Sequence, residues 1–179
     1  GMIRDRGDAI LRVSGVKIML DGSLGARTAR LTKPYSDDPG NKGILLCSRT
    51  RLLELLRRVR EMKLQAAVHA IGDEACTLAL QALTDVWNEE EGLKQQRLEH
   101  VSVLTRDLLS RLKRMRLMVS VQPQFILSDS WVVERVGPAR ARFVYALRSL
   151  VDRGLIMAGG SDSPIERLSP FAGIYAAVT

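Results

Sequence analysis

The stretch "LQAAVHAIGDEA" (residues 64–75) holds the features on which the fold prediction depends. An apolar run ends at a histidine, and a glycine turn then leads into a helical pattern. A short apolar run bounded by a turn signal predicts a buried β-strand over 65–70. Asp73 opens the segment "DEACTLALQALTDVW", whose apolar spacing predicts a helix. The stretch is therefore predicted to form one strand, a turn and one helix.

Similar runs recur along the chain and alternate with helical patterns. Strands are predicted over 15–20, 65–70, 97–103, 117–123 and 155–162. Helices are predicted to open at Ser48, Asp73, Thr105 and Pro138, and Gly154 closes the last one. This alternation predicts an α/β fold with a parallel sheet covered on both faces, either a (β/α) barrel or a doubly wound fold. A length of 179 residues predicts a single domain, 1–179.

Composition narrows the classes of function. No apolar stretch approaches the roughly 18 residues that a bilayer span needs, and no signal-peptide pattern opens the chain, so we expect no membrane partner and a cytoplasmic protein. Cys47 and Cys76 are too few and too scattered for a disulfide framework or a paired-cysteine zinc site.

The net charge of +7 raises the question of nucleic-acid binding. Most of the arginines stand between apolar residues in predicted helices such as "RTRLLELLRRVREMK", where a solvated helix face explains them. Only 4% of the residues are aromatic, which leaves little to stack on bases. We therefore expect no nucleic-acid partner.

The segment 21–47 interrupts the alternation. It is rich in Gly, Pro, Asp and Ser and shows no sustained period. Loops of this length are uncommon unless they are functional or disordered, so this one is predicted to lie over a substrate site. A tolerated surface excursion is the alternative.

Polar side chains lie at or near the ends of four predicted strands: Lys17, His69, His100 and Asp162. The carboxyl ends of parallel strands share one face, so these side chains should converge there. Each has a plainer explanation, because a histidine can be a hydrogen-bonded core residue, a lysine can pair or snorkel, and an aspartate can cap a turn. The equivalent positions of both histidines favour an imidazole- and oxygen-rich site for a divalent metal.

The strings "VKIMLDGSLGARTA", "VHAIGDEA", "RLEHVSV" and "GGSDSPIERLSPFAGIYAAVT" resemble the metal-dependent amidohydrolases, in the branch that includes N-substituted formamide deformylases. The resemblance implies a (β/α)8 TIM barrel, of which this chain supplies strands 4 to 8 with their helices. It implies Lys17 as a metal ligand, carboxylated where members use a bridging lysine, and His69 and His100 as further ligands. Asp162 would bind metal and act as the catalytic carboxylate.

The implied activity is hydrolysis of an amide or related C–N bond in a small-molecule substrate. The expected cofactor is a divalent metal, zinc above all, which activates water and polarises a carbonyl while a carboxylate moves the proton. Three residues in the long loop or at a strand end are the predicted substrate-binding residues: Asp21, Arg27 and Gln122.

The chain also departs from the family pattern. It has two histidines and no His-x-His pair, whereas members carry such a pair on the first strand. We therefore expect a fragment or a truncated product with a weak metal site. The alternatives are a catalytically silent α/β remnant or interaction module, and an isomerase-type or phosphate-binding enzyme on another α/β scaffold. No GxGxxG or GxxxxGK[ST] string supports nucleotide binding.

The missing strands bear on assembly. Five strands of an eight-stranded barrel would leave 15–20 and 155–162 as open edges beside an exposed apolar interior. Proteins rarely leave such a surface uncovered, so we expect a two-fold homodimer or a rearrangement of the terminal segments.

Overall fold

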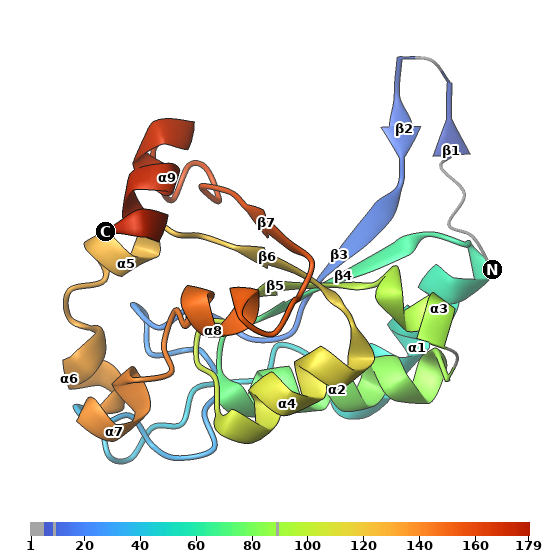
Figure 1. The fold of residues 1–179 in the computed structure, drawn as a ribbon. Coiled ribbons are helices and arrows are strands. Elements are labelled where there is room, and N and C mark those ends of the chain that lie inside the picture. The colour runs from blue at the N-terminus through green and yellow to red at the C-terminus, as the bar shows by residue number, and fades with distance from the viewer. Residues whose placement is uncertain (1–5, 9, 89) are drawn as a thin grey trace.

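The five predicted strands form one parallel sheet (Figure 1). The computed structural model describes residues 6–8, 10–88 and 90–179, so residues 1–5, 9 and 89 of the predicted domain lie outside the described residues. The strands are β3 (Gly15–Met19), β4 (Gln65–Ala70), β5 (Arg97–His100), β6 (Met118–Val121) and β7 (Met157–Gly159). They lie side by side in chain order, and each neighbouring pair is parallel. The α/β class predicted from the sequence is confirmed.

The edges of the sheet are β3 and β7, the two strands expected to lack a neighbour. Pairing of a second copy along these edges stays a prediction, which light scattering of the purified chain would test. A short antiparallel pair that the sequence did not predict, β1 (Arg6–Gly7) and β2 (Arg12–Val13), precedes β3 and projects away from the sheet (Figure 1).

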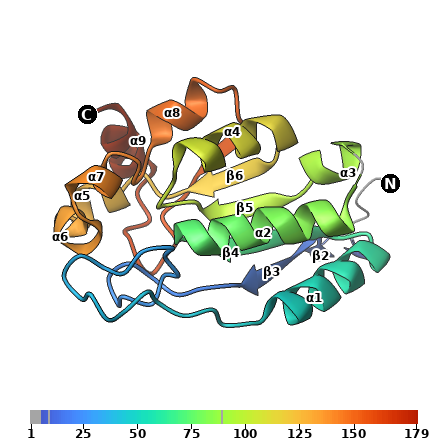
Figure 2. The ribbon, with the colours of Figure 1, turned by 90° about the horizontal axis from the view of Figure 1, so that it is seen from below.

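Three helices cover one face of the sheet: α1 (Arg49–Glu61), α2 (Asp73–Val86) and α4 (Arg106–Met115) (Figures 1 and 2). Helices α1 and α4 begin where their capping side chains predicted, because the Ser48 hydroxyl accepts a hydrogen bond from the Arg51 N–H and the Thr105 hydroxyl from the Leu108 N–H. The short helix α3 (Glu90–Lys94) leads into β5. Alternate strand residues face the helices and form the core, among them Ile18, Val68, Leu98 and Val119.

The opposite face of the sheet, called here the open face, has no covering helix over β3 and β4 in the described part of the chain (Figure 1). Met19 is 45% exposed there, whereas Ile18, on the helix-covered face, is 6% exposed. The expectation of a sheet covered on both faces is therefore wrong for the edge strand β3, whereas Ala67 and His69 of β4, which lie on the same face, are only 4% and 6% exposed. Small residues such as Ala67 give β4 an apolar composition on both sides, and composition alone does not show whether a second layer is present.

The single helix predicted over 138–154 is replaced by two short helices, α7 (Pro138–Ala141) and α8 (Leu147–Val151). The chain breaks at Tyr145, whose φ of 48° is left-handed. The Tyr145 N–H donates to the Ser102 carbonyl at 2.9 Å, and its hydroxyl donates to the Asp129 carboxylate. These contacts with distant segments override the local helical pattern.

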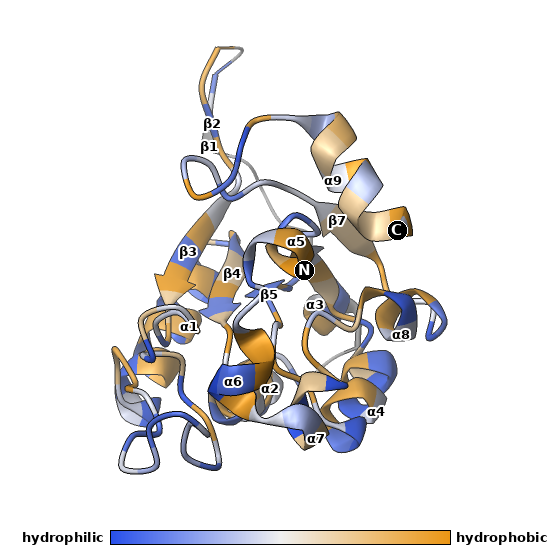
Figure 3. Cartoon of the chain, turned by 90° about the vertical axis from the view of Figure 1, so that its left-hand side faces the viewer, coloured by the Kyte–Doolittle hydropathy of each residue, from blue (hydrophilic) through white to orange (hydrophobic). Residues whose placement is uncertain are grey.

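Further helices surround the carboxyl ends of the strands. They are α5 (Phe125–Ser128) and α6 (Val132–Val136), which the sequence did not predict, and α9 (Pro170–Val178). Helix α9 is largely hydrophobic (Figure 3), although its Phe171 is 83% exposed and its Val178 is 76% exposed. No helix among the described residues is both long enough and apolar enough to cross a membrane.

Candidate metal centre

The structure brings the four strand-end residues into one cavity. Lys17, His69, His100 and Asp162 all line a cavity of about 630 Å³ at the carboxyl ends of the strands. The centres of the two imidazole rings are 4.3 Å apart, and the Lys17 Nζ is 3.9 Å from the Asp162 Oδ1. The geometry predicted from parallel strand ends is therefore present. The roles of these residues as ligands or as a base stay predictions.

His69 has one ring nitrogen engaged and one without a partner. Its Nε2 lies 3.0 Å from the Gly22 carbonyl oxygen and 3.5 Å from the Asp21 Oδ1. A carbonyl oxygen and an ionised carboxylate accept hydrogen bonds and cannot donate them, so Nε2 carries the proton. In the neutral ring the Nδ1 is then a lone-pair nitrogen, and it is buried without a hydrogen-bond partner among the described residues.

His100 shows the reverse arrangement. Its Nδ1 lies 2.7 Å from the Gln122 Oε1, and its buried Nε2 has no hydrogen-bond partner in the part of the chain that the structure describes. Burial, reinforced by the neighbouring His69, lowers the pKa of His100 to about 4. The imidazole of His100 is therefore neutral at physiological pH, which is the form that binds a metal ion.

These observations test whether the residues fit a metal. Two imidazoles, each with a buried nitrogen that has no hydrogen-bond partner among the described residues, lie in contact in the same cavity as a carboxylate. Buried polar atoms without a partner are rare, and imidazole and carboxylate groups are the usual ligands of zinc. The donor set fits a divalent ion. Within residues 6–8, 10–88 and 90–179 no three His, Cys, Asp or Glu side chains are close enough together to hold one metal ion. The set of metal ligands is therefore incomplete among the described residues.

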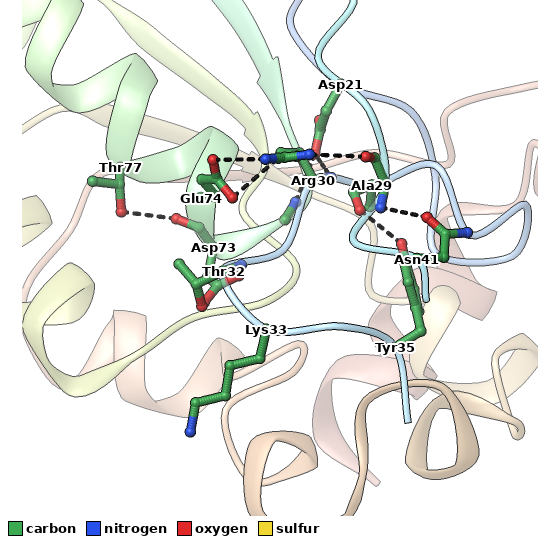
Figure 4. A network of polar contacts seen from close by, with 12 residues as sticks. Asp21, Ala29, Arg30, Thr32, Lys33, Tyr35, Asn41, Asp73, Glu74 and Thr77 are labelled. Carbon is green, nitrogen blue, oxygen red and sulfur yellow. Dashed lines mark hydrogen bonds and ion pairs between the residues drawn. The ribbon is translucent and has the colours of Figure 1, made fainter. Parts of the chain in front are cut away.

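Asp21, the first residue of the long loop, connects the loop to the end of β4 by hydrogen bonds (Figure 4). This carboxylate is fully buried and accepts hydrogen bonds from the N–H groups of Arg30 (2.9 Å), Ile71 (3.0 Å) and Gly72 (2.8 Å). Burial raises the pKa of Asp21, and the three N–H groups act in the opposite direction. Gly72 has no room for a side chain, because a Cβ would lie 1.9 Å from the Arg30 carbonyl oxygen.

A second set of contacts holds the loop against the start of α2 (Figure 4). The Asp73 carboxylate accepts from both the N–H and the hydroxyl of Thr32, and the Arg30 guanidinium pairs with Glu74. Tyr35, which is 1% exposed, donates its hydroxyl to the Ala29 carbonyl at 2.8 Å. The loop also carries a small apolar core of its own, formed with residues of three other segments: Leu24, Ala29, Leu31, Tyr35, Ile71, Val103 and Val136.

The loop is therefore a fixed wall of the cavity rather than a surface excursion. Its residues 22–25 and Thr28 line the cavity beside His69. The sequence interpretation placed this loop over a substrate site, and its position agrees with that, although substrate binding itself stays a prediction.

The three predicted substrate-binding residues lie in different surroundings. The Asp21 carboxylate accepts hydrogen bonds from backbone N–H groups, and the Gln122 side-chain oxygen contacts the His100 ring. Arg27 forms an ion pair with Asp37, with 2.9 Å between Nη2 and Oδ2, and it is not among the described residues that line the cavity. Contact of these three with a substrate stays a prediction.

The cavity also contains residues that the sequence analysis missed. They come mainly from the irregular segments after β6 and β7: Phe125, Asp129, Trp131, Tyr145, Ile165 and Glu166. Burial raises the pKa of the Asp129 carboxyl and, together with the bond to Asp129, the pKa of the Tyr145 hydroxyl. The segment 124–137 has no strand period, so its sequence signals were two aromatic residues, Phe125 and Trp131.

Comparison with known proteins identifies the family. Residues 3–179 match the model described as the amidohydrolase family. The chain belongs to this family. It is 38% identical over 182 residues to the YtcJ protein of Bacillus subtilis (strain 168), whose name places it among the amidohydrolases. The resemblance found in the sequence is confirmed.

Two crystal structures of other proteins show the same fold. They are uncharacterized metal-dependent hydrolases from Pyrococcus furiosus (41% identity, TM-score 0.89) and Pyrococcus horikoshii (42% identity, TM-score 0.87). The match covers 98% of this chain and 36% of the first, and 99% of this chain and 35% of the second. For YtcJ the figures are 97% and 34%. This amidohydrolase chain thus spans about a third of the length of its relatives, and its sheet and helices form part of a (β/α)8 barrel.

Proposed function

We propose that the chain supplies part of the active site of a metal-dependent hydrolase that cleaves an amide or related C–N bond in a small molecule. The observation that supports this most strongly is the pair of unpartnered nitrogens, Nδ1 of His69 and Nε2 of His100, buried at the strand ends of an amidohydrolase chain. The Pyrococcus relatives, named as metal-dependent hydrolases, support the same class of activity.

The residues that would hold the ion are His69, His100 and Asp162, with Lys17 as a further ligand if it is carboxylated. Zinc suits this mixture of imidazole and carboxylate ligands. A bound divalent ion would lower the pKa of a water molecule towards neutrality and polarise the substrate carbonyl.

Asp162 is the group to which we assign the movement of the proton. Its carboxylate lines the cavity and is held near the Lys17 ammonium at 3.9 Å. As a general base it would accept the proton of the attacking water, and as an acid it would return that proton to the leaving nitrogen. This return is needed because an amine leaves a tetrahedral centre far more readily than an amide anion does.

The other cavity walls would bind the substrate. Phe125, Trp131 and Tyr145 present aromatic rings, and Leu24 and Ile71 add aliphatic surface. Such walls bind an apolar substituent and reduce the water around the reacting carbonyl.

The test combines metal analysis with an assay. The purified chain, loaded with zinc, is incubated with a panel of N-substituted formamides and N-acyl amines, and the released amine is measured. We expect amine release that a chelator stops, and a loss of at least about 100-fold in rate for Asp162→Asn. Asp152→Asn is the matched control, because Asp152 also pairs with a basic residue, Arg148, but it directly follows α8 and is not among the described residues that line the cavity.

Equal rates for Asp162→Asn and the unmodified chain would show that Asp162 is not the base. A chain that binds no zinc and releases no amine would instead favour the catalytically silent module.

A further inference from the structure

The contact between Gln122 and His100 has no role in the proposed proton transfer. Gln122 follows β6 directly, and the pairing of Glu99 with Ser120 brings the ends of β5 and β6 together. His100 is 4% exposed and Gln122 is 6% exposed, and 2.7 Å separates the imidazole Nδ1 from the amide Oε1. The sheet register therefore holds the amide against the ring out of reach of bulk solvent.

This contact fixes where the imidazole proton lies. The amide Oε1 only accepts, so the His100 Nδ1 must donate. A neutral imidazole has a single ring proton, so Nε2 keeps its lone pair. Free neutral histidine in water favours the opposite form, with the proton on Nε2. Gln122 therefore works against the intrinsic preference of the ring.

His69 provides the contrast within the same cavity. Its Nε2 faces the Gly22 carbonyl, so its proton lies on Nε2 and its lone pair on Nδ1. The two rings are thus held in opposite tautomers, and in each the unpartnered nitrogen is the one without a proton. The Gly22 carbonyl and the Gln122 amide oxygen are thus the described contacts that keep both lone pairs available at once.

We propose that Gln122 is a positioning residue: its side-chain oxygen holds His100 in the Nδ1–H tautomer, which keeps Nε2 as a ligand for a divalent cation. The part of this proposal that concerns the cation rests on the proposed function. The tautomer is a property of the chain alone and can be measured without metal or substrate.

The tautomer is measured by NMR. The chain has two histidines, so labelling with ¹⁵N-histidine gives four ring nitrogens, and a long-range ¹H–¹⁵N spectrum at pH 8 shows which nitrogen of each ring is protonated. We expect Nδ1–H for His100 and Nε2–H for His69. Gln122→Met, which removes the acceptor at similar length, should move the His100 proton to Nε2 wholly or in large part. Gln122→Glu, which keeps an acceptor oxygen, should retain Nδ1–H.

The spectrum contains its own control, because an unchanged His69 pattern shows that the variant is folded. Two results would overturn the proposal. The first is a His100 ring protonated on Nε2 in the unmodified chain, which would mean that the Gln122 amide is reversed and donates. The second is a folded Gln122→Met that keeps Nδ1–H. The first result is decisive even if Gln122→Met does not fold.

Zinc titration against a chromophoric chelator connects the tautomer to the metal. We expect Gln122→Met to weaken zinc binding about 10- to 100-fold, and Gln122→Glu to stay within about threefold of the unmodified chain. A Gln122→Met chain that changes tautomer and yet binds zinc as the unmodified chain does would refute the positioning role and leave the metal site standing. An unmodified chain that binds no zinc would refute the proposed function, and the cation part of this proposal with it, while the spectra alone would decide the tautomer part.

Discussion

Replacing His100 by Asn or His69 by Gln is expected to weaken zinc binding by more than about 100-fold while the fold is kept. The two substitutions are chosen from the geometry. The Asn amide can place an N–H where the His100 Nδ1 donates to Gln122, and the Gln amide can place one where the His69 Nε2 donates to Gly22. Each variant then lacks only the unpartnered nitrogen.

Zinc affinity would be measured by chelator competition, and folding by thermal denaturation followed by circular dichroism. The control is Cys47→Ser, because a partly exposed thiol is the obvious alternative zinc ligand in this chain. We expect Cys47→Ser to bind zinc as the unmodified chain does. If zinc binding were lost in Cys47→Ser and kept in both histidine variants, the site would not be at the strand ends.

The second large effect is on stability. Asp21→Ala is expected to lower the free energy of unfolding by about 3 to 5 kcal/mol, because it leaves three N–H groups without their acceptor in a fully buried place. These donors belong to the backbone of Arg30, Ile71 and Gly72, so they cannot reorient to find water without moving the loop. Urea denaturation at pH 7 measures the change.

Asp73→Asn is the comparison variant, at the contact between the same loop and the start of α2. Asp73 also accepts two hydrogen bonds, but one comes from the Thr32 hydroxyl, which can turn and accept from the new amide. We expect a loss of about 1 kcal/mol. Equal losses for the two variants would mean that the backbone donors at Asp21 are satisfied in another way.

The parts of the fold that depend on local signals could be predicted from the sequence. Ser48 and Thr105 were recognised as helix caps because a capping hydroxyl acts within three residues of its own position. The break at Tyr145 could not be recognised, because it depends on Ser102 and Asp129, which are distant in sequence. Short predicted strands also ended early: β5 stops at His100, where φ is 75°.

The same division holds for the candidate site. His69 and His100 were found because each stands at the end of an apolar run, and the run is a local pattern. The role of Gln122 beside His100 depends on which strands are neighbours and on their register. An apolar run in the sequence carries no information on either. Asp21 was assigned to substrate binding because it opens the long loop, and its burial among backbone donors became visible only in the folded chain.

The order of the strands has a consequence for the way the chain folds. Each strand pairs with its neighbour in sequence, but the lengths of chain between partners differ: 21 residues separate Glu99 from Ser120, and 50 separate Met19 from His69. Because the entropy lost on closing a loop grows with the logarithm of its length, joining β5 to β6 costs about 0.8 kcal/mol less than joining β3 to β4. Chain entropy thus favours early pairing of β5 with β6, which places Gln122 beside His100. Strand β3, which carries Lys17, would pair with β4 later, because the long loop and α1 lie between them.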